Sequence, residues 1–429
     1  MTPYQNLYET TGTLLPFEKG ETDLRPLCGA SVICTEHPFE SRNWSVHPPA
    51  NYENSGPTYE ALVAYFLERN PHSGRAFTRE LHLPDRDIDE NRRFTYTVLA
   101  PPRGTERQAR RATLMLHGLN EKSWHKYVPW AVRLVELTGQ PVILFPLAFH
   151  MNRAPAAWSD PRNMMGVYRE RQSLFGALSS GSFANAALSH RVQFAPHRFL
   201  TSSFQSYYDI VDLARSIAAG EVPGLSRGCR LDLFGYSIGA SLATLLLMRD
   251  PHRLFCESQG FLFCGGAVLE DANPVSRAII DEAAFTGLTG YLRRLVRRAS
   301  TALPEEIERP GRRARELRLF RSLIFHDSLR RVRERAMRRI NVRVRALALE
   351  QDPVFPPASI RRSWTGRSGA SLLRVHTRDT DLPYSHEKPF PQTVGRSDEL
   401  ERFFDAVFQA AAHHLVGAPL HAPATRAIV

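Results

Sequence analysis

The chain has 429 residues, of which 43% are hydrophobic and 23% charged, and its formal net charge is +11. This composition is typical of a soluble globular protein. No apolar run reaches the eighteen or so residues that a membrane-spanning helix needs, so no transmembrane segment is expected. The N-terminal residues lack the basic and apolar regions of a signal peptide, and we expect a cytoplasmic protein.

The cysteines give no sign of a disulfide framework or a zinc site. There are five, an odd number, and none forms a CxxC pair. Both features argue against paired or metal-bound thiols. The cysteines are Cys28, Cys34, Cys229, Cys256 and Cys264.

The positive charge is concentrated between residues 291 and 340, where 16 Arg and no Lys stand against 6 acidic residues. A basic surface of this kind could bind anionic lipid, nucleic acid or an acidic substrate. The simpler interpretation, which we favour, is a solvated helical face in a chain that uses Arg at nearly every cationic position. We therefore expect no nucleic-acid partner and keep peripheral contact with an anionic surface as the alternative.

The chain divides into an N-terminal segment and a core that begins at residue 75. Residues 1–74 have weak periodicity and many turn residues, and only 58–68 is predicted to be a helix. This segment is expected to pack on the core. RAFTRELHLP (75–84) and RRFTYTVLAPP (92–102) alternate apolar and polar residues, as half-buried antiparallel strands do. Residues 112–149 predict a strand, a loop, a helix and a second strand parallel to the first.

The middle of the chain is predicted to carry helical insertions. The aromatic-rich stretch from 158 to about 204 suggests a helical insertion over the site, followed by a helix at 207–218. CRLDLFGYSIGASLATLLLM (229–248) predicts a strand, a tight turn and a helix, and GFLFCGGAV (260–268) the next buried strand. Residues 270–340 are expected to be helical throughout. So long a stretch between two core strands favours an Arg-rich cap insertion at 271–340.

The core resumes at residue 341. VRVRALALEQDPVFPP and SLLRVHTRD predict two further strands, and 398–415 predicts a C-terminal helix. The expected fold is α/β, with a mostly parallel central sheet flanked by helices and a helical cap insertion. The expected divisions are 1–74, the first part of the core at 75–270, the cap at 271–340 and the last part of the core at 341–429.

The Gly-x-Ser-x-Gly turn at 235–239 is the strongest chemical motif. A serine between a buried strand and an apolar helix can sit on a strained turn that exposes its hydroxyl oxygen. Gly235 and Gly239 fit this geometry, because a Cβ would collide as the strand folds back against the helix. An ordinary Gly-Ser turn is the alternative, and the flanking strand and helix favour Ser237 as a nucleophile.

A carboxylate and a histidine follow the serine at late strand ends. Asp352 lies in an Asp-Pro turn just after one strand, and His386 lies in the loop after the next. Such a carboxylate would orient the imidazole and stabilise its protonated form, which makes Asp352 the acid and His386 the base. An Asp-Pro turn without function is the alternative for Asp352. Asp379 and Asp381 remain candidates for the acid, because they share the loop of His386.

Two strand ends supply candidates for binding the substrate. His117 and Gly118 end one strand, and a glycine there would let the N–H of Leu119 join that of Ile238 as an oxyanion donor. A polar cluster follows the next strand, where ligands of open α/β sheets bind, although surface solvation would also explain it. The expected substrate-binding residues are His117, Gly118, His150, Asn152, Arg153 and Tyr236.

The chain resembles the α/β-hydrolase superfamily over about residues 75–415, through His117-Gly118, GYSIG (235–239), Asp352 and His386. The runs LHGLNEKSW, VILFPLAFHMNRAP, FGYSIGA, FLFCGG and YSHEKPFP are most similar to an uncharacterised bacterial family of α/β-hydrolase-like proteins. The superfamily resemblance implies the same nucleophile, base and acid, with no metal and no organic cofactor.

The expected function is therefore a serine hydrolase, esterase-like or lipase-like, that cleaves an acyl bond of a small molecule through an acyl-enzyme. The bond could be an ester, thioester, lactone or amide. An acyltransferase on the same residues is one alternative. A non-catalytic binding module that uses the basic helices is another, because a fold alone does not establish catalysis.

Overall fold

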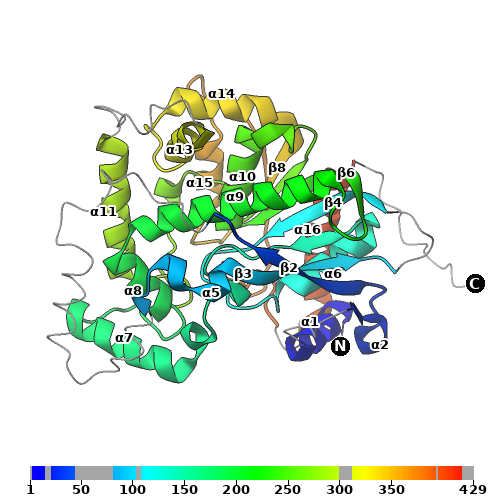
Figure 1. Cartoon of the computed structure of the whole chain (residues 1–429), viewed down its shortest axis with the longest axis horizontal. Helices are drawn as coiled ribbons and strands as arrows, with labels where there is room; N and C mark the ends of the chain where they lie inside the picture. The colour runs from blue at the N-terminus through cyan, green and yellow to red at the C-terminus, as the bar shows by residue number, and fades with distance from the viewer. Residues whose placement is uncertain are drawn as a thin grey trace, which may run out of the picture.

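The structure is a computed structural model that describes residues 2–14, 21–43, 81–102, 108–298, 312–392 and 395–417. Nine strands form one sheet in the order β1-β2-β3-β5-β4-β6-β7-β8-β9 (Figure 1). The strands are β1 (Glu21–Asp23), β2 (Ile33–Glu40), β3 (Arg93–Ala100), β4 (Ala109–Leu116), β5 (Val142–Leu144), β6 (Leu225–Tyr236), β7 (Gly260–Phe263), β8 (Val344–Leu349) and β9 (Arg374–Arg378).

The helices surround this sheet, and no described helix is long and apolar enough to cross a membrane. The α-helices are α1 (Pro3–Leu14), α2 (Arg25–Cys28), α5 (Asp89–Arg92), α6 (Tyr127–Thr138), α7 (Pro161–Phe175), α8 (Ala186–Phe194), α9 (His197–Ala219), α10 (Ile238–Arg249), α11 (Glu282–Arg298), α13 (Arg312–Ser322), α14 (Arg330–Ile340), α15 (Pro357–Ser363) and α16 (Ser397–Val416).

The sheet is mostly parallel, as the sequence predicts. From β5 to β9 every neighbouring pair is parallel, whereas β1, β2 and β3 form an antiparallel edge that joins the rest through β3 and β5. The predicted parallel pair β4 and β5 is confirmed, with Thr113 opposite Val142. The carboxyl ends of the parallel strands therefore meet at one edge, where an open α/β sheet binds its ligands.

Both faces of the sheet are buried under helices. Leu114 of β4 and Leu233 of β6 belong to the hydrophobic core that contains α9 and α10. Met115 and Phe234, one position along each strand, belong to the core on the other face with α6 and α16 (Figure 1). Strands with both faces covered are apolar at successive positions, which explains why β4 and β6 were recognisable in the sequence.

The N-terminal segment is more regular than its sequence suggests. β2 pairs with the whole of β3 in antiparallel register, from Ile33 opposite Ala100 to Glu40 opposite Arg93. Its sequence, ICTEHPFE, includes a proline and charged residues, so it lacks the signal of a strand. Pro38 is tolerated because β1 pairs only with Ile33, Cys34 and Thr35, so β2 has a neighbouring strand on one side alone at the proline. The helix predicted at 58–68 lies outside the described residues.

Two other predicted elements differ in the structure. The prediction of a strand at 75–84 is wrong for residues 81–84, which form a helix end and a turn. Residues 75–80 lie outside the described residues. The helix predicted at 207–218 begins earlier, at His197, and forms the long α9. The first turns of this helix contain polar residues such as Ser202 and Ser206, so the apolar pattern does not mark where the helix begins.

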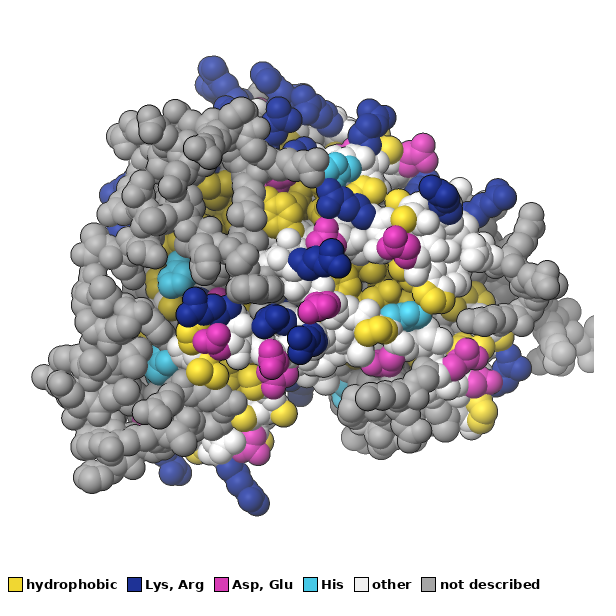
Figure 2. Space-filling view, in the orientation of Figure 1, with side chains coloured by type: hydrophobic (Ala, Val, Ile, Leu, Met, Phe, Trp, Pro, Cys, Tyr) yellow, Lys and Arg dark blue, Asp and Glu magenta, His cyan; other side chains and the backbone are white. Residues whose placement is uncertain are grey.

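The stretch 270–340 is not helical throughout in the part that the structure describes. Turns separate α11 from the strand before it and α13 from α14, and α11 packs against α8 while α13 and α14 pack against α10. The exposed Arg331, Arg335 and Arg338 lie on α14, and Figure 2 shows cationic side chains along that edge of the molecule. Arg333 is instead buried, and its guanidinium donates to backbone carbonyls of the preceding turn, including that of His326 at 2.7 Å.

Candidate active site

Ser237 lies on a strained turn between β6 and α10. Its backbone angles, φ 57° and ψ −122°, are in a region that side chains other than glycine rarely adopt. Such a conformation costs about 1–3 kcal/mol and persists only where the surrounding structure enforces it. Its backbone N–H donates to the carbonyl of Phe263 at the end of β7, at 3.1 Å, which fixes the turn to the neighbouring strand.

The glycines on either side of the serine allow close packing around this turn. A Cβ built on Gly239 would lie 2.4 Å from the carbonyl oxygen of Leu116 at the end of β4. One built on Gly235 would lie 2.6 Å from the Cα of Ala240. Both positions therefore exclude any side chain, which is the reason the sequence suggested for this pair.

Ser237, His386 and Asp352 form one hydrogen-bonded chain. The Nε2 of His386 lies 2.8 Å from the Oγ of Ser237, and its Nδ1 lies 2.8 Å from Oδ2 of Asp352. Since an ionised carboxylate only accepts hydrogen bonds, the proton belongs on Nδ1, and Nε2 is free to accept the serine proton. All three side chains are buried.

Asp352 is held independently of the histidine. Its Oδ1 accepts the backbone N–H groups of Val354 and Phe355 at 2.8 and 3.1 Å. The rival carboxylates lie elsewhere. Asp379 is exposed and accepts from Tyr384 at 3.1 Å, and Asp381 is exposed on the same loop. Of the three candidates, Asp352 is the one that the structure places against His386.

Tyr236 packs against the imidazole of His386. Its ring stacks on that of His386, with centroids 5.3 Å apart and planes 15° apart. Its hydroxyl donates to the backbone carbonyl of His386. Burial raises its pKa well above the ordinary value, so the hydroxyl remains a donor. The structure thus gives Tyr236 a positioning contact in place of the substrate contact expected from the sequence.

The loop after β4 is fixed by internal hydrogen bonds. The Nδ1 of His117 donates to the carbonyl of Gly118 at 2.8 Å, and its Nε2 accepts the N–H of Leu147 at 2.9 Å. Burial holds the pKa of His117 well below the ordinary value, so its ring is neutral at pH 7. The N–H of Gly118 donates to the hydroxyl of Tyr127 at 2.9 Å. His117 and Gly118 therefore shape the loop, while Leu119 reaches the cavities.

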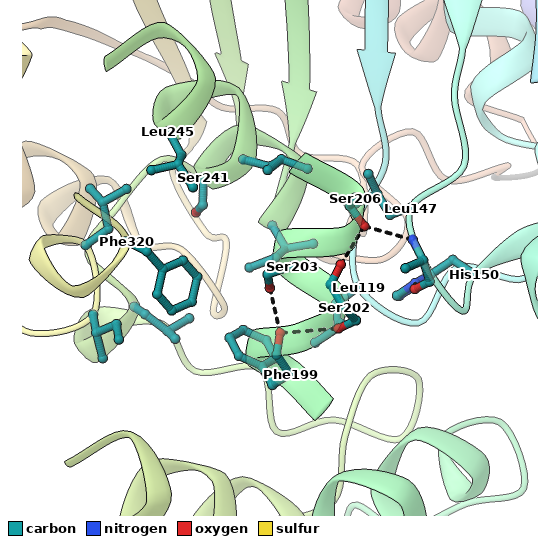
Figure 3. Close-up of a pocket in the computed structure, with 16 residues that line it drawn as sticks. Leu119, Leu147, His150, Phe199, Ser202, Ser203, Ser206, Ser241, Leu245 and Phe320 are labelled. Atoms are coloured by element: carbon teal, nitrogen blue, oxygen red, sulfur yellow. Dashed lines mark hydrogen bonds between the residues drawn. The ribbon is translucent and has the colours of Figure 1, made fainter. Parts of the chain in front are cut away.

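An apolar cavity of about 80 Å³ lies beside Leu119 and Ile238 (Figure 3). One wall comes from α10, one from α9 and a third from the end of α13 and the turn after it. Among the described residues, its lining is mainly apolar and includes Leu147, Phe199, Leu242, Leu245, Phe320, Leu323 and Ile324. His150, one of the expected substrate-binding residues, also lines this cavity, and burial lowers its pKa to about 4, which keeps the ring neutral.

Two further hollows meet at Leu119. A small cavity of about 50 Å³ shares Leu119, His150 and Phe199 with the apolar cavity. A wide groove of about 680 Å³ runs from Leu119 past α1 and the loop that follows His386. Lys122 lines both the small cavity and the groove. Within the described ranges, no group of His, Cys, Asp or Glu side chains is arranged to hold a metal ion.

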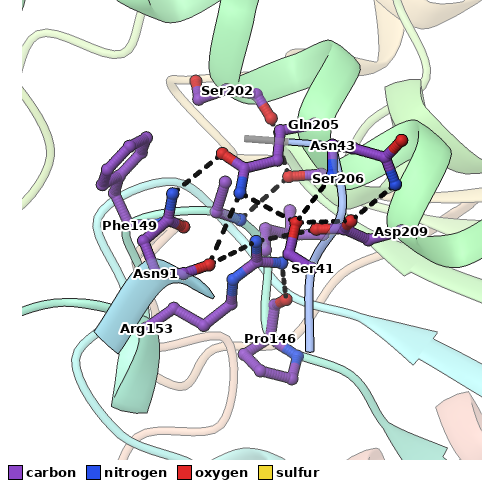
Figure 4. Close-up of polar contacts among 12 residues, drawn as sticks. Ser41, Asn43, Asn91, Pro146, Phe149, Arg153, Ser202, Gln205, Ser206 and Asp209 are labelled. Carbon is purple, nitrogen blue, oxygen red and sulfur yellow. Dashed lines mark hydrogen bonds and ion pairs between the residues drawn. The ribbon is translucent and has the colours of Figure 1, made fainter. Parts of the chain in front are cut away.

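Asn152 and Arg153 lie away from these cavities. Asn152 is exposed and donates to the carbonyl of Thr95 at 2.9 Å. Arg153 is fully buried and pairs with Asp209 of α9 at 2.8 Å (Figure 4). It also donates to the carbonyl of Pro146 at 3.1 Å and lies 4.1 Å from the ring centroid of Phe94. Both residues were expected to bind the substrate in the cleft. In the structure their side chains contact other parts of the protein instead.

The pair Arg153 and Asp209 is predicted to be a major stabilising element. Asp209→Ala leaves a fully buried guanidinium without its counter-charge, so we expect the free energy of unfolding to fall by about 3–5 kcal/mol. Denaturant unfolding followed by circular dichroism measures this. Asp212→Ala, three residues along α9, is the control. Asp212 has an exposed ion pair with Arg215 and accepts a hydrogen bond from Asn43 at 2.9 Å, so its loss should cost no more than about 1–2 kcal/mol. Similar small losses in both variants would contradict the prediction.

Sequence reasoning missed most residues that line the cavities. Phe199 and Phe320 come from helices whose inward faces depend on how the helices pack, and no local pattern marks them. Lys122 had one available signal: it is one of four lysines in a chain otherwise rich in Arg, and it lies in the loop directly after the His117-Gly118 pair.

The sheet, the flanking helices and the turn at Ser237 define an α/β-hydrolase fold. The chain belongs to the family of unknown function DUF6051, whose sequence profile matches residues 21–416. A search of the curated proteins finds no match.

Solved structures with a similar fold include several esterases. An esterase from Pseudomonas putida ECU1011 is 11% identical, with 97% of this chain and 90% of that one covered and a TM-score of 0.40. Carboxyl esterase 2 from Tuber melanosporum is 10% identical, with 75% and 81% covered and a TM-score of 0.39. TT1662 from Thermus thermophilus is 15% identical, with 76% and 94% covered and a TM-score of 0.37.

Proposed function

We propose that this protein is a serine hydrolase that cleaves short-chain acyl esters through an acyl-enzyme. The observation that carries the proposal is the hydrogen-bonded chain from Ser237 through His386 to Asp352, with the serine on its strained turn. A nucleophile within hydrogen-bond reach of a base, which a third group orients, is the general signature of covalent acyl transfer.

The reaction follows from the protonation states of this chain. His386 accepts the proton of Ser237 at Nε2 as the serine oxygen attacks the ester carbonyl, and the imidazolium is stabilised by Asp352. The imidazolium then protonates the leaving alkoxide, which leaves an acyl-serine. A water molecule, deprotonated by His386, attacks the acyl-serine, and the proton returns to Ser237 as the carboxylic acid leaves.

Backbone N–H groups of Ile238 and Leu119 are the proposed oxyanion donors. Ile238 is the first residue of α10, and the first N–H groups of a helix have no acceptor within the helix. Leu119 follows Gly118 in the loop that β4 brings beside Ile238, and both residues line the apolar cavity. The positive end of the α10 dipole would add to the stabilisation of the oxyanion.

The apolar cavity is the proposed site of the acyl chain. Its volume of about 80 Å³ holds roughly five water-sized groups, which matches a chain of a few carbons. Phe320, Leu323 and Ile324 close one wall, and this contact supports 271–340 as a cap that limits the chain length. The divisions at 1–74, 75–270 and 341–429 remain part of the same proposal.

A series of 4-nitrophenyl esters with acyl chains of two to twelve carbons tests the proposal. We expect kcat/KM to be highest at about four to six carbons and to fall for longer chains, because a cavity of about 80 Å³ has room for only a few carbons. Release of 4-nitrophenol measures turnover, and the Ser237→Ala protein is the blank. A fluorophosphonate probe should label the native protein and leave this variant unlabelled. Equal turnover by the two proteins, or equal labelling, would contradict the proposal.

A further inference from the structure

Lys122 carries a charge with no partner at the junction of two hollows. It lies three residues after Leu119, in the same loop, and lines both the small cavity and the wide groove. In the described part of the chain its ammonium has no hydrogen bond or ion pair, and Glu121 is the charge that acts on it. Glu121 is itself paired with Lys126 and accepts from the hydroxyl of Tyr127 at 2.9 Å.

Lys122 keeps its positive charge although the surrounding protein lowers its pKa. The Lys122 side chain is exposed to solvent, and the surrounding protein lowers its pKa to about 8. The ammonium is therefore mostly protonated at pH 7. An anion bound beside this ammonium would accept a charge-assisted hydrogen bond, which is stronger than one between neutral groups.

The small cavity as a whole favours negative charge. The described residues that line it include Lys122, Arg191 and Arg198 and no Asp or Glu. Arg191 and Arg198 are both paired with one carboxylate, Asp85, at 2.6 and 3.3 Å. His82 and His190 lie near the two arginines and add no charge at pH 7. Burial lowers the pKa of His82 to about 4 and that of His190 well below its ordinary value.

We propose that the small cavity binds a carboxylate carried by the ester substrate, and that Lys122 is the residue that recognises it. The inference rests on the proposed hydrolase function and narrows its substrate class to anionic acyl esters. The small cavity and the apolar cavity share Leu119, His150 and Phe199, so a carboxylate there would be a short chain away from the reacting carbonyl. The carboxylate could belong to the acyl part or to the alcohol part.

Three esters distinguish these sources: neutral 4-nitrophenyl butanoate, mono-4-nitrophenyl succinate with a carboxylate on the acyl side, and 4-carboxyphenyl butanoate with one on the alcohol side. Lys122→Met removes the charge and keeps the length of the side chain. We expect it to lower kcat/KM by about 10- to 100-fold for at least one charged ester and by less than about twofold for the neutral one.

Lys122→Arg is the matched variant, because it keeps the charge. Its ratio of kcat/KM for the charged ester to kcat/KM for the neutral ester should stay within about threefold of the native value. A purely structural role of Lys122 would instead lower kcat/KM for all three esters alike. That result would overturn the inference. It would also be overturned if Lys122→Met changed kcat/KM no more for the charged esters than for the neutral ester.

Binding of free succinate separates this inference from the proposed function. Isothermal titration calorimetry on the Ser237→Ala protein, which cannot turn over, should show binding that weakens at least about tenfold when Lys122→Met is added. If native protein hydrolyses no ester but succinate binding depends on Lys122, the hydrolase proposal fails and the carboxylate site stands. If the neutral ester is hydrolysed and succinate binding does not depend on Lys122, the hydrolase proposal stands and the carboxylate site fails.

Discussion

Ser237→Ala and His386→Ala are each expected to lower kcat by about 10⁴- to 10⁶-fold, to a similar residual level. The serine oxygen and the imidazole lie 2.8 Å apart in one hydrogen-bonded chain, so neither can act without the other. Removing both should therefore cost little more than removing one. Turnover of 4-nitrophenyl butanoate by the two single variants and the double variant measures this non-additivity.

Ser226→Ala provides the matched control for the serine. Ser226 lies on the same strand, β6, at the end away from the site, and its hydroxyl donates to the carbonyl of Ala109 at 3.1 Å. Its replacement should leave kcat within about twofold, because surface and peripheral changes cost little. A double variant of Ser237 and His386 that is far worse than either single variant would show that the two act in separate steps.

The features of the site that could be predicted from the sequence are those that local geometry imposes. A serine on a strained turn needs glycines at fixed spacing, a buried strand before it and a helix after it, and all of these leave a trace in neighbouring residues. The order Ser237, Asp352, His386 could also be read, because each follows a recognisable strand. The structure then brings these three distant residues into one hydrogen-bonded chain.

The contacts of other polar residues could not be predicted, because they depend on distant partners. Arg153 looked like a cleft residue, since it follows a strand end, but its partner is Asp209 on α9, which packs across the sheet. His117 looked available for the substrate, and both of its ring nitrogens are used to fix the loop. A polar residue at a strand end can bind a substrate or contact another part of the protein. The sequence does not distinguish these two roles, because they depend on how the elements pack.

Neither the strand β2 nor the cavity walls could be predicted from the sequence, for a related reason. β2 is specified by its register with β3, from Ile33 opposite Ala100 onward, more than by its own residues, which include a proline. The cavity forms where α9, α10 and the end of α13 converge. Phe199 and Phe320 therefore come together from segments far apart in the chain, and each helix by itself shows only an apolar face.

Asp352→Asn is expected to lower kcat by about 10⁴-fold with the fold intact. The geometry around the carboxylate determines how the amide would sit. Oδ1 accepts the N–H groups of Val354 and Phe355 at 2.8 and 3.1 Å, and only an oxygen can fill that position. The amide NH₂ would then take the place of Oδ2, 2.8 Å from Nδ1 of His386, and donate to it. An imidazole that accepts at Nδ1 carries its proton on Nε2 and cannot take the proton of Ser237.

The same substitution at the rival carboxylates tests whether this effect belongs to Asp352. Asp379 and Asp381 are exposed on the loop that leads to His386, so Asp379→Asn and Asp381→Asn should change kcat by less than about threefold. Circular dichroism and the unfolding midpoint should be close to native in all three variants, because an amide replaces a carboxylate of equal size. A mild effect of Asp352→Asn together with a large loss in either other variant would assign the orienting role to the exposed loop. The hydrogen bonds from Val354 and Phe355 would then serve only to shape the turn after β8.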